Sequence, residues 1–188
     1  MPLPSPWMLE AAFGLSELGL SLLRRSKSNV DVKDDRGSLR LIWGVILAAM
    51  LGATLLWQFF PQAQWPMSGS SYIAGLTVFG VGLLLRWYSI FYLGRYFTVD
   101  VAVATDHKVI DTGPYKYIRH PSYAGVLLEF LGFALCMGNV AALLLLMIAV
   151  SCVFLRRIRI EEAVLQGALG ERYASYMRRT WRLVPFLY

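Results

Sequence analysis

The sequence is poor in charged residues and contains long stretches with none. Of its 188 residues, 57% are hydrophobic and 16% are charged, whereas soluble domains carry roughly 25% charge. Residues 41–85 include no Lys, Arg, Asp, Glu or His, and between Pro121 and Leu155 the only charged residue is Glu129. Each stretch is longer than the ~20 apolar residues that one membrane helix needs, so each is expected to hold two helices. The composition excludes a disordered chain and favours a membrane-integral one.

Cysteine and the common metal and nucleotide motifs are also scarce. Cys136 and Cys152 both fall within apolar stretches, so we expect small packing residues rather than a redox pair or metal ligands. No CxxC, HExxH or GxxxxGK[ST] motif is present, and Gly80-Val81-Gly82 lacks the third glycine of a dinucleotide fingerprint. The sequence therefore predicts no metal site, and the two glycines indicate close helix packing.

The apolar pattern predicts an all-α integral membrane protein that forms one domain over residues 1–188, with five transmembrane helices. They are expected at about 7–23, 41–60, 71–93, 122–137 and 140–155, followed by cytoplasmic C-terminal helices over 156–182. Glu10, Glu17 and Glu129 are costly in a bilayer and should face the bundle interior. The opening Met-Pro-Leu-Pro has no basic residues and no small-residue cleavage site follows, which argues against a removed signal peptide.

The basic residues predict the orientation. Six of the 18 Lys and Arg lie in residues 24–40, five in 86–120 and seven in 156–188, with none in the alternate loops. The positive-inside rule then puts the N-terminus outside and the C-terminus in the cytoplasm, in a multi-pass protein of the cell (inner) membrane. Because the long charge-free stretches indicate a membrane-integral chain, membrane lipids are the expected partners, and nucleic acid is not.

Two predicted cytoplasmic segments are rich in polar residues. In the first, Arg119 and His120 precede Pro121, which suits the first turn of a helix. Helix N-termini favour anionic groups, so this corner is either a basic anchor beside the membrane or a site for a carboxylate or phosphate. Period-2 residues over Val99–Val103, before the Gly113-Pro114 turn, indicate a small extended lid or hairpin over the helix ends.

In the second segment, Glu161 and Glu162 are neighbours on a helix that continues the last span. They point about 100° apart, so the two carboxylates cannot play the same role. A solvated charge run is the alternative interpretation. Tyr173 and Tyr176 share one helix face, and core packing is the alternative interpretation of this pair.

Four short motifs in this region point to one family. They are Leu93-Gly94-x-x-Phe97-Thr98, then Gly113-Pro114-Tyr115-x-x-x-Arg119-His120-Pro121-x-Tyr123-x-Gly125, then Glu161-Glu162-x-x-Leu165 and Gly170-x-x-Tyr173-x-x-Tyr176. Over roughly residues 75–180 the chain resembles the isoprenylcysteine carboxyl methyltransferase family. It is also similar to phospholipid N-methyltransferases in the Arg-His-Pro and paired-glutamate elements.

The resemblance implies a helical membrane enzyme that binds S-adenosyl-L-methionine at its cytoplasmic face. The pocket would be formed by the 94–121 loop and the C-terminal helices, with Arg119 and Glu162 as the catalytic candidates. The cofactor-binding residues that it implies are Tyr115, Arg119, His120, Pro121, Tyr123, Gly125, Glu161, Glu162, Tyr173 and Tyr176. A carboxylate of this cofactor suits Arg119 or His120, and its ammonium or ribose hydroxyls suit the glutamates.

The methyl acceptor remains open between several classes. A lipophilic small molecule or lipid fits a site at the membrane boundary, and the carboxylate of an isoprenylcysteine-like compound is favoured. Such a carboxylate needs a cation, for which Arg95 and Arg119 are candidates. An amine acceptor, as in a phospholipid N-methyltransferase, needs a base instead, and His107 is one of the groups near enough to consider. A non-catalytic membrane binding protein of the same fold and a sterol-type reductase are the remaining alternatives.

Overall fold

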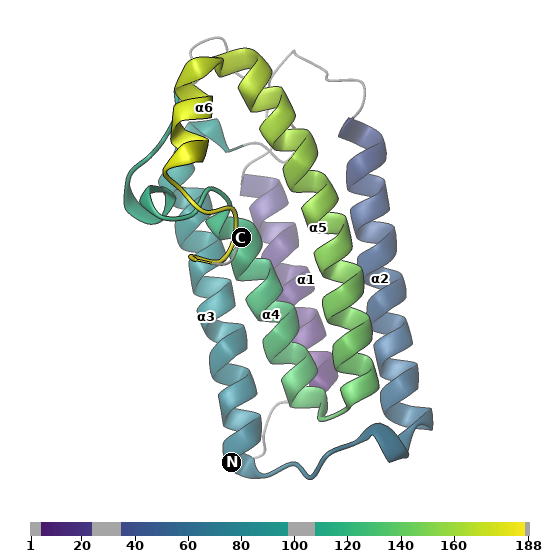
Figure 1. Cartoon of the computed structure of the whole chain (residues 1–188). Helices are drawn as coiled ribbons and strands as arrows, with labels where there is room; N and C mark the ends of the chain where they lie inside the picture. The colour runs from purple at the N-terminus through teal and green to yellow at the C-terminus, as the bar shows by residue number, and fades with distance from the viewer. Residues whose placement is uncertain (1–4, 24–34, 98–107, 187–188) are drawn as a thin grey trace.

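The computed structural model describes residues 5–23, 35–97 and 108–186, which form an all-helical fold (Figure 1). Within these ranges the β-type backbone pairing amounts to two isolated bridges, Gln64 with Asn139 and Ile118 with Trp181. The elements are α1 (Pro6–Leu23), α2 (Asp35–Phe59), η1 (Pro61–Ala63), α3 (Gly69–Leu93), η2 (Gly94–Tyr96), η3 (Gly113–Lys116), α4 (Pro121–Met137), α5 (Val140–Leu169) and α6 (Glu171–Arg178).

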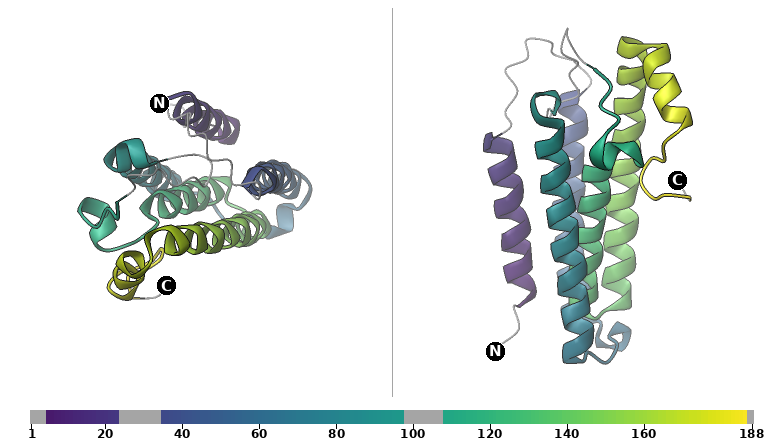
Figure 2. Two further views of the ribbon diagram at one scale, coloured as in Figure 1. Left: turned by 90° about the horizontal axis from the view of Figure 1, so that it is seen from above. Right: turned by 90° about the vertical axis from the view of Figure 1, so that its left-hand side faces the viewer.

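The five long helices run alongside one another, and α6 folds back beside the end of α5 (Figures 1 and 2). Helix α4 is central, because it packs against α1, α3 and α5. It begins at Pro121, in the first helical turn as expected. The turn between α4 and α5 lies at Gly138-Asn139: Gly138 adopts a left-handed conformation, and the Asn139 side chain accepts a hydrogen bond from the Ala142 amide at 3.0 Å.

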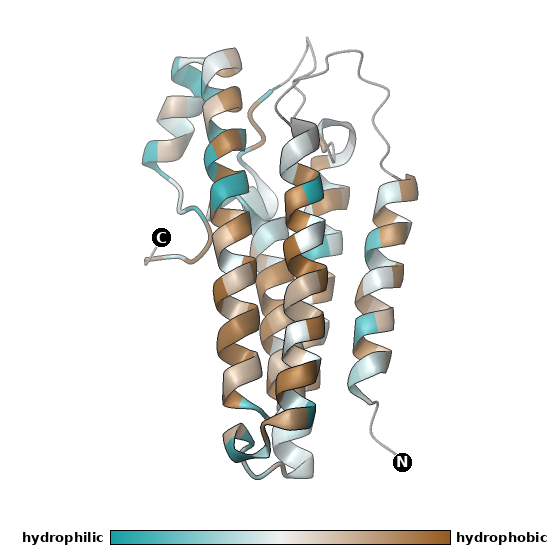
Figure 3. Ribbon diagram, turned by 90° about the vertical axis from the view of Figure 1, so that its right-hand side faces the viewer, coloured by the Kyte–Doolittle hydropathy of each residue, from teal (hydrophilic) through white to brown (hydrophobic). Residues whose placement is uncertain are grey.

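The outer surface of the bundle is apolar, as a lipid-facing surface must be. Large hydrophobic side chains on the outward faces are more than half exposed, among them Leu47, Leu51, Leu84 and Ile148. Polar residues concentrate toward one end, while the middle of the bundle is hydrophobic (Figure 3). Helices α2, α3 and α5 are long and apolar enough to cross a membrane, whereas α4 is apolar but shorter.

The helix boundaries differ from the sequence prediction at two places. Helix α2 starts at Asp35 rather than near residue 41, because the polar residues before the apolar stretch continue the same helix. The C-terminal helices end at Arg178 rather than at 182, since Trp181 pairs through its backbone with Tyr117 and Arg119 instead. The lid predicted at Val99–Val103 lies outside the described residues.

Two glycines on each helix bring α3 and α4 into close contact. A Cβ atom built on Gly75 or Gly82 of α3, or on Gly125 or Gly132 of α4, would lie 2.3–2.7 Å from atoms of the other helix. Because real Cβ atoms do not approach so closely, only glycine allows this separation of the backbones. By contrast, a Cβ atom on Gly80 would meet nothing within 4 Å. Of the two glycines in Gly80-Val81-Gly82, only Gly82 serves the helix packing expected from the sequence.

The three acidic residues within the predicted spans lie in different surroundings. Glu17 of α1 forms a buried two-bond ion pair with Arg86 of α3. Glu10 accepts a hydrogen bond of 3.3 Å from the Thr54 hydroxyl of α2. Both carboxyl oxygens of Glu129 are buried, and neither has a hydrogen-bond partner among the described residues. Glu17 and Glu129 thus face the bundle interior as expected.

The glycine contact yields a test with a control in the same helix. We expect Gly82→Ala to lower the free energy of unfolding by about 1–3 kcal/mol, because the added methyl group overlaps the α4 backbone. Gly80→Ala should leave it unchanged or raise it slightly, because that position is open and alanine favours a helix. Thermal unfolding of the detergent-solubilised protein measures both, and equal midpoints would contradict this description of the α3–α4 contact.

Candidate active site

The two polar motifs predicted to form one site do meet in space. Arg119 and His120 immediately precede α4, and Glu162 lies in the last third of α5, 43 and 42 residues away in sequence. The Arg119 Nε atom lies 2.8 Å from Glu162 Oε1, and His120 Nε2 lies 3.3 Å from the same oxygen. Glu162 is only 4% exposed, so this contact is a buried ionic cluster rather than a solvated charge run.

Arg119 also fixes the end of the chain. Its Nη1 atom donates to the carbonyl oxygen of Met177 at 3.0 Å, to the carbonyl oxygen of Thr180, and to the Thr180 hydroxyl at 3.3 Å. The guanidinium thus links three parts of the chain: the end of α6, the segment that follows α6, and the Glu162 side chain of α5. Since its side chain is 7% exposed, Arg119 makes these bonds largely shielded from water.

The backbone next to Arg119 pairs with the C-terminal segment. The Trp181 amide donates to the Tyr117 carbonyl at 3.0 Å, the Arg119 amide to the Trp181 carbonyl at 2.7 Å, and the His120 amide to the Arg182 carbonyl at 3.1 Å. This pairing places Arg182 Nε 2.9 Å from Glu162 Oε2. One buried carboxylate therefore faces two guanidinium groups and an imidazole, which leaves an excess of positive charge around it.

Tyr123 connects this cluster to the second glutamate. Its hydroxyl donates to Glu161 Oε2 at 2.8 Å, and its ring stacks on His120 with centroids 5.6 Å apart. The two neighbouring glutamates thus differ in their partners, as their helical positions predict. Glu161 pairs with a neutral phenol, whereas Glu162 pairs with cations.

Three further tyrosines close the cluster on the side of α6. The Tyr176 hydroxyl donates to the Tyr115 carbonyl at 2.7 Å, and the Tyr115 hydroxyl donates to the Ser89 carbonyl at 3.2 Å. Tyr173 and Tyr176 lie side by side, with ring centroids 5.8 Å apart. Burial raises the pKa of Tyr115, Tyr173 and Tyr176 well above the ordinary value, so all three phenols remain protonated donors at neutral pH.

Two of the predicted site residues, Gly125 and Pro121, have surroundings that indicate a structural role. Gly125 lies against Gly82 and Arg86 of α3, where it permits the close helix contact. Pro121 is buried in the first turn of α4. Their role in cofactor binding stays a prediction. His107 and the side chain of Arg95, both considered from the sequence, lie outside the described residues.

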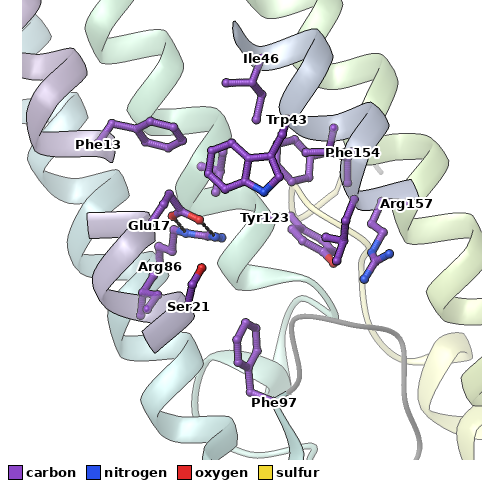
Figure 4. A pocket seen from close by; sticks show the side chains of 14 residues that line it. Phe13, Glu17, Ser21, Trp43, Ile46, Arg86, Phe97, Tyr123, Phe154 and Arg157 are labelled. Carbon is purple, nitrogen blue, oxygen red and sulfur yellow. Dashed lines mark hydrogen bonds and ion pairs between the residues drawn. The ribbon is translucent and has the colours of Figure 1, made fainter. Parts of the chain in front are cut away.

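A cavity lies next to the cluster, on the side that faces the helical bundle. It is open to the outside, and about 700 Å³ of space not filled by protein atoms lies within it, open solvent included. Tyr123 and Arg157 line it beside the Glu17–Arg86 pair, and Figure 4 shows Tyr123 between that pair and Arg157. Most of the remaining lining is apolar: Phe13, Leu20, Leu39, Ile42, Trp43, Ile46, Phe97, Val126 and Phe154. The cavity therefore has a polar end next to the cluster and an apolar body.

Comparison with known proteins identifies the family. The model of the isoprenylcysteine carboxyl methyltransferase family matches residues 74–167, half of the chain. The chain belongs to this family. The matched segment contains α4 and the paired glutamates of α5, but it ends before Tyr173, Tyr176 and Arg182.

Two curated relatives and one solved structure describe the similarity. Protein-S-isoprenylcysteine O-methyltransferase B of Arabidopsis thaliana is 32% identical over 69% of this chain and 66% of its own length. Protein-S-isoprenylcysteine O-methyltransferase A of the same plant is 26% identical over 93% of this chain and 88% of its own. The structure of the eukaryotic intramembrane Ras methyltransferase, an isoprenylcysteine carboxyl methyltransferase, superposes with a TM-score of 0.71 at 23% identity. That superposition covers 95% of this chain.

The chain matches less than two thirds of several relatives. The shares are 66%, 46% and 62% of the first three curated proteins and 64% of the solved structure. Its helical membrane fold is that of the isoprenylcysteine carboxyl methyltransferase family, and the all-α class predicted from the sequence is confirmed.

Sequence reasoning missed three residues of the cluster. Thr180 and Arg182 bind Arg119 and Glu162 directly, and the backbone of Trp181 holds both in place. The only signal in the sequence for this segment was its basic residue, Arg182, because the backbone pairing with residues 117–120 follows no local pattern. The missed partner inside the bundle was Arg86, which neutralises Glu17.

Proposed function

We propose that this protein is an S-adenosyl-L-methionine-dependent methyltransferase that modifies a lipophilic carboxylate, such as that of an isoprenylcysteine-like compound. The observation that carries the proposal is the cluster of Arg119, His120 and Glu162, with the half-buried Glu161 beside it, which adjoins a largely apolar cavity through Tyr123. A donor site and an acceptor site in contact are what a transfer between a polar and a lipophilic molecule requires.

The chemistry of the donor set fits S-adenosyl-L-methionine. Arg182 and His120 offer cationic or hydrogen-bonding groups suited to its amino-acid carboxylate. Glu161 offers a carboxylate suited to its ammonium group or ribose hydroxyls, and Tyr173 offers a buried ring beside which adenine can stack. Among the described residues, no group of three or more His, Cys, Asp and Glu could hold a metal ion, and this reaction needs none.

The protein's part in the reaction is to bring the two reactants into line. When bound, S-adenosyl-L-methionine would supply a sulfonium methyl group and leave as the neutral thioether, and an ionised carboxylate acceptor would need no base. Tyr123 stands at the boundary of both sites, and its bond to Glu161 fixes its hydroxyl. Alignment of this kind contributes up to about 7–11 kcal/mol to a two-reactant step.

Within this proposal, Arg119 and Glu162 support the site rather than react. Each makes several strong bonds within the protein, to α6, to the C-terminal segment or to the other. Their ion pair holds His120 and Arg182 where the donor would bind. The proposal therefore keeps all ten predicted residues at or beside the site, with Gly125 and Pro121 acting through helix packing.

Binding of the demethylated product, S-adenosylhomocysteine, tests the proposal without any acceptor. Calorimetry of the detergent-solubilised protein should show micromolar binding, because the cluster is already assembled. His120→Gln and Glu161→Gln should each weaken it at least about tenfold, since a lost charge-assisted hydrogen bond costs ~1.5–3 kcal/mol. Cys152→Ala, at an exposed position of α5, serves as the control. Wild-type protein that binds no product, or variants that bind as tightly as the control, would refute it.

We further propose that all five long helices cross the cell (inner) membrane, with the N-terminus outside and the C-terminus in the cytoplasm. Two features support this topology. Helix α4 is enclosed by helices that are themselves apolar, and arginines occur in the second half of α5 and in α6, which lies at one end of the bundle (Figure 1). The donor site then lies at the boundary between membrane and cytoplasm.

Thiol labelling tests this orientation. Gln62 and Arg172 are exposed at opposite ends of the bundle, so each is replaced by cysteine in a background without Cys136 and Cys152. In intact cells, an impermeant maleimide should label Gln62→Cys, and Arg172→Cys should react only after lysis. The reverse pattern, or labelling of both in intact cells, would contradict the proposed topology.

A further inference from the structure

The segment that follows α6 exposes large apolar side chains. Trp181, Val184 and Phe186 are all exposed, Phe186 to 85%, and so is Tyr117 in the turn beside them. The rings of Trp181 and Phe186 lie with centroids 5.8 Å apart, and the Trp181 amide donates to the Tyr117 carbonyl at 3.0 Å. These four side chains form a surface that we call the C-terminal patch.

The C-terminal patch lies where α4 begins. Backbone hydrogen bonds join Trp181 and Arg182 to residues 117–120, which immediately precede the first turn of α4, and Figure 1 shows the chain end beside that turn. In the proposed topology the start of α4 is at the cytoplasmic boundary of the membrane. Tryptophan and tyrosine are enriched at this depth, where one part of the ring meets lipid and the other meets water.

Basic side chains surround the C-terminal patch. The Lys116 Nζ atom lies 5.7 Å from the centroid of the Tyr117 ring. Arg178 and Arg179 pair with carboxylates, but both arginine side chains are more than half exposed, so these pairs are weak and open to competition. Over residues 108–118 and 171–181, exposed basic side chains outnumber the acidic ones: Lys108, Lys116, Arg172, Arg178 and Arg179 against Asp111 and Glu171. Exposed aromatic rings among basic side chains suit an anionic lipid surface.

The same segment supplies two partners of the ionic cluster. Arg182 Nε lies 2.9 Å from Glu162 Oε2, and the Thr180 carbonyl accepts from Arg119. Residues 181–186 thus have two sides: Arg182 and the buried Leu183 face the protein, while Trp181, Val184 and Phe186 are exposed. A contact that fixes the exposed side chains therefore also fixes Arg182.

We infer that the C-terminal patch binds anionic phospholipids of the cytoplasmic leaflet, and that this contact holds Arg182 against Glu162. The apolar side chains enter the headgroup region, and Lys116 and Arg179 bind lipid phosphates. The lipid contact is independent of any reaction, whereas its effect on the donor site rests on the proposed function. The affinity for the methyl donor then depends on the lipid composition of the membrane.

Fluorescence quenching tests the lipid contact without any cofactor. A nitrobenzoxadiazole fluorophore is attached at Val184→Cys in a background without Cys136 and Cys152. The protein is reconstituted in phosphatidylcholine vesicles with or without about 30% phosphatidylglycerol, and brominated acyl chains are the quencher. We expect quenching about twofold stronger or more in the anionic vesicles, because electrostatic attraction adds to apolar burial.

Matched charge variants check that this effect is local. Lys116→Gln/Arg179→Gln should abolish the difference between the two vesicles. Arg40→Gln, which removes an exposed basic residue of α2, should keep it, since α2 and α6 lie on opposite sides of the bundle (Figures 1 and 2). Equal quenching in both vesicles, or the same loss in Arg40→Gln, would overturn the lipid contact.

Binding of S-adenosylhomocysteine in lipid nanodiscs tests the effect on the donor site. The wild-type protein should bind it about threefold more tightly or better in anionic discs, because the lipid contact and the donor site are coupled through Arg182. Trp181→Ser/Phe186→Ser should remove this difference. Arg182→Gln should also remove it but leave the fluorophore quenching unchanged, since it breaks the coupling and not the lipid contact.

The outcomes separate this inference from the proposed function. If no protein binds S-adenosylhomocysteine, the proposed function is refuted and the effect on the donor site with it, while quenching still decides the lipid contact. If S-adenosylhomocysteine binds equally well in both kinds of disc, the coupling is refuted and the proposed function stands. Arg182→Gln protein that keeps the lipid dependence would likewise overturn the part assigned to Arg182.

Discussion

The buried carboxylate of Glu162 is the group on which the arrangement of the site depends. It is bound by Arg119 from the start of α4, by His120 beside it, and by Arg182 from the C-terminal segment. A carboxylate taken out of water is stable only when cations and donors surround it. Because its partners come from three separate parts of the chain, satisfying this single charge joins α4, α5 and the segment after α6.

The packing of the central helix places the site at one end of an apolar bundle. The glycine contact between α3 and α4 fixes the central helix, whose first turn presents His120 and Tyr123. Tyr123 faces both the ionic cluster and the cavity. Under the proposed function, a polar donor would approach from water and a lipophilic acceptor from lipid, and both would reach Tyr123.

Much of the fold follows from local patterns in the sequence. Uncharged stretches mark the helices, Pro121 marks the start of α4, and Gly138-Asn139 marks the turn before α5. The family resemblance predicted that Arg119 and Glu162 belong to one pocket, but it did not predict their direct ion pair. Arg182 was not predicted, because a backbone pairing between residues 117–120 and 180–182 brings it to Glu162, and such a pairing depends on how distant segments pack.

The most direct measurement of this account is a double-mutant cycle between Arg119→Gln and Glu162→Gln, followed by thermal unfolding in detergent. The account predicts a coupling free energy of about 1–3 kcal/mol, because the two buried groups share one network. The exposed pair of Arg178 and Glu171 should show no measurable coupling in the same assay. Additive effects of Arg119→Gln and Glu162→Gln would contradict the claim that this ion pair assembles the site.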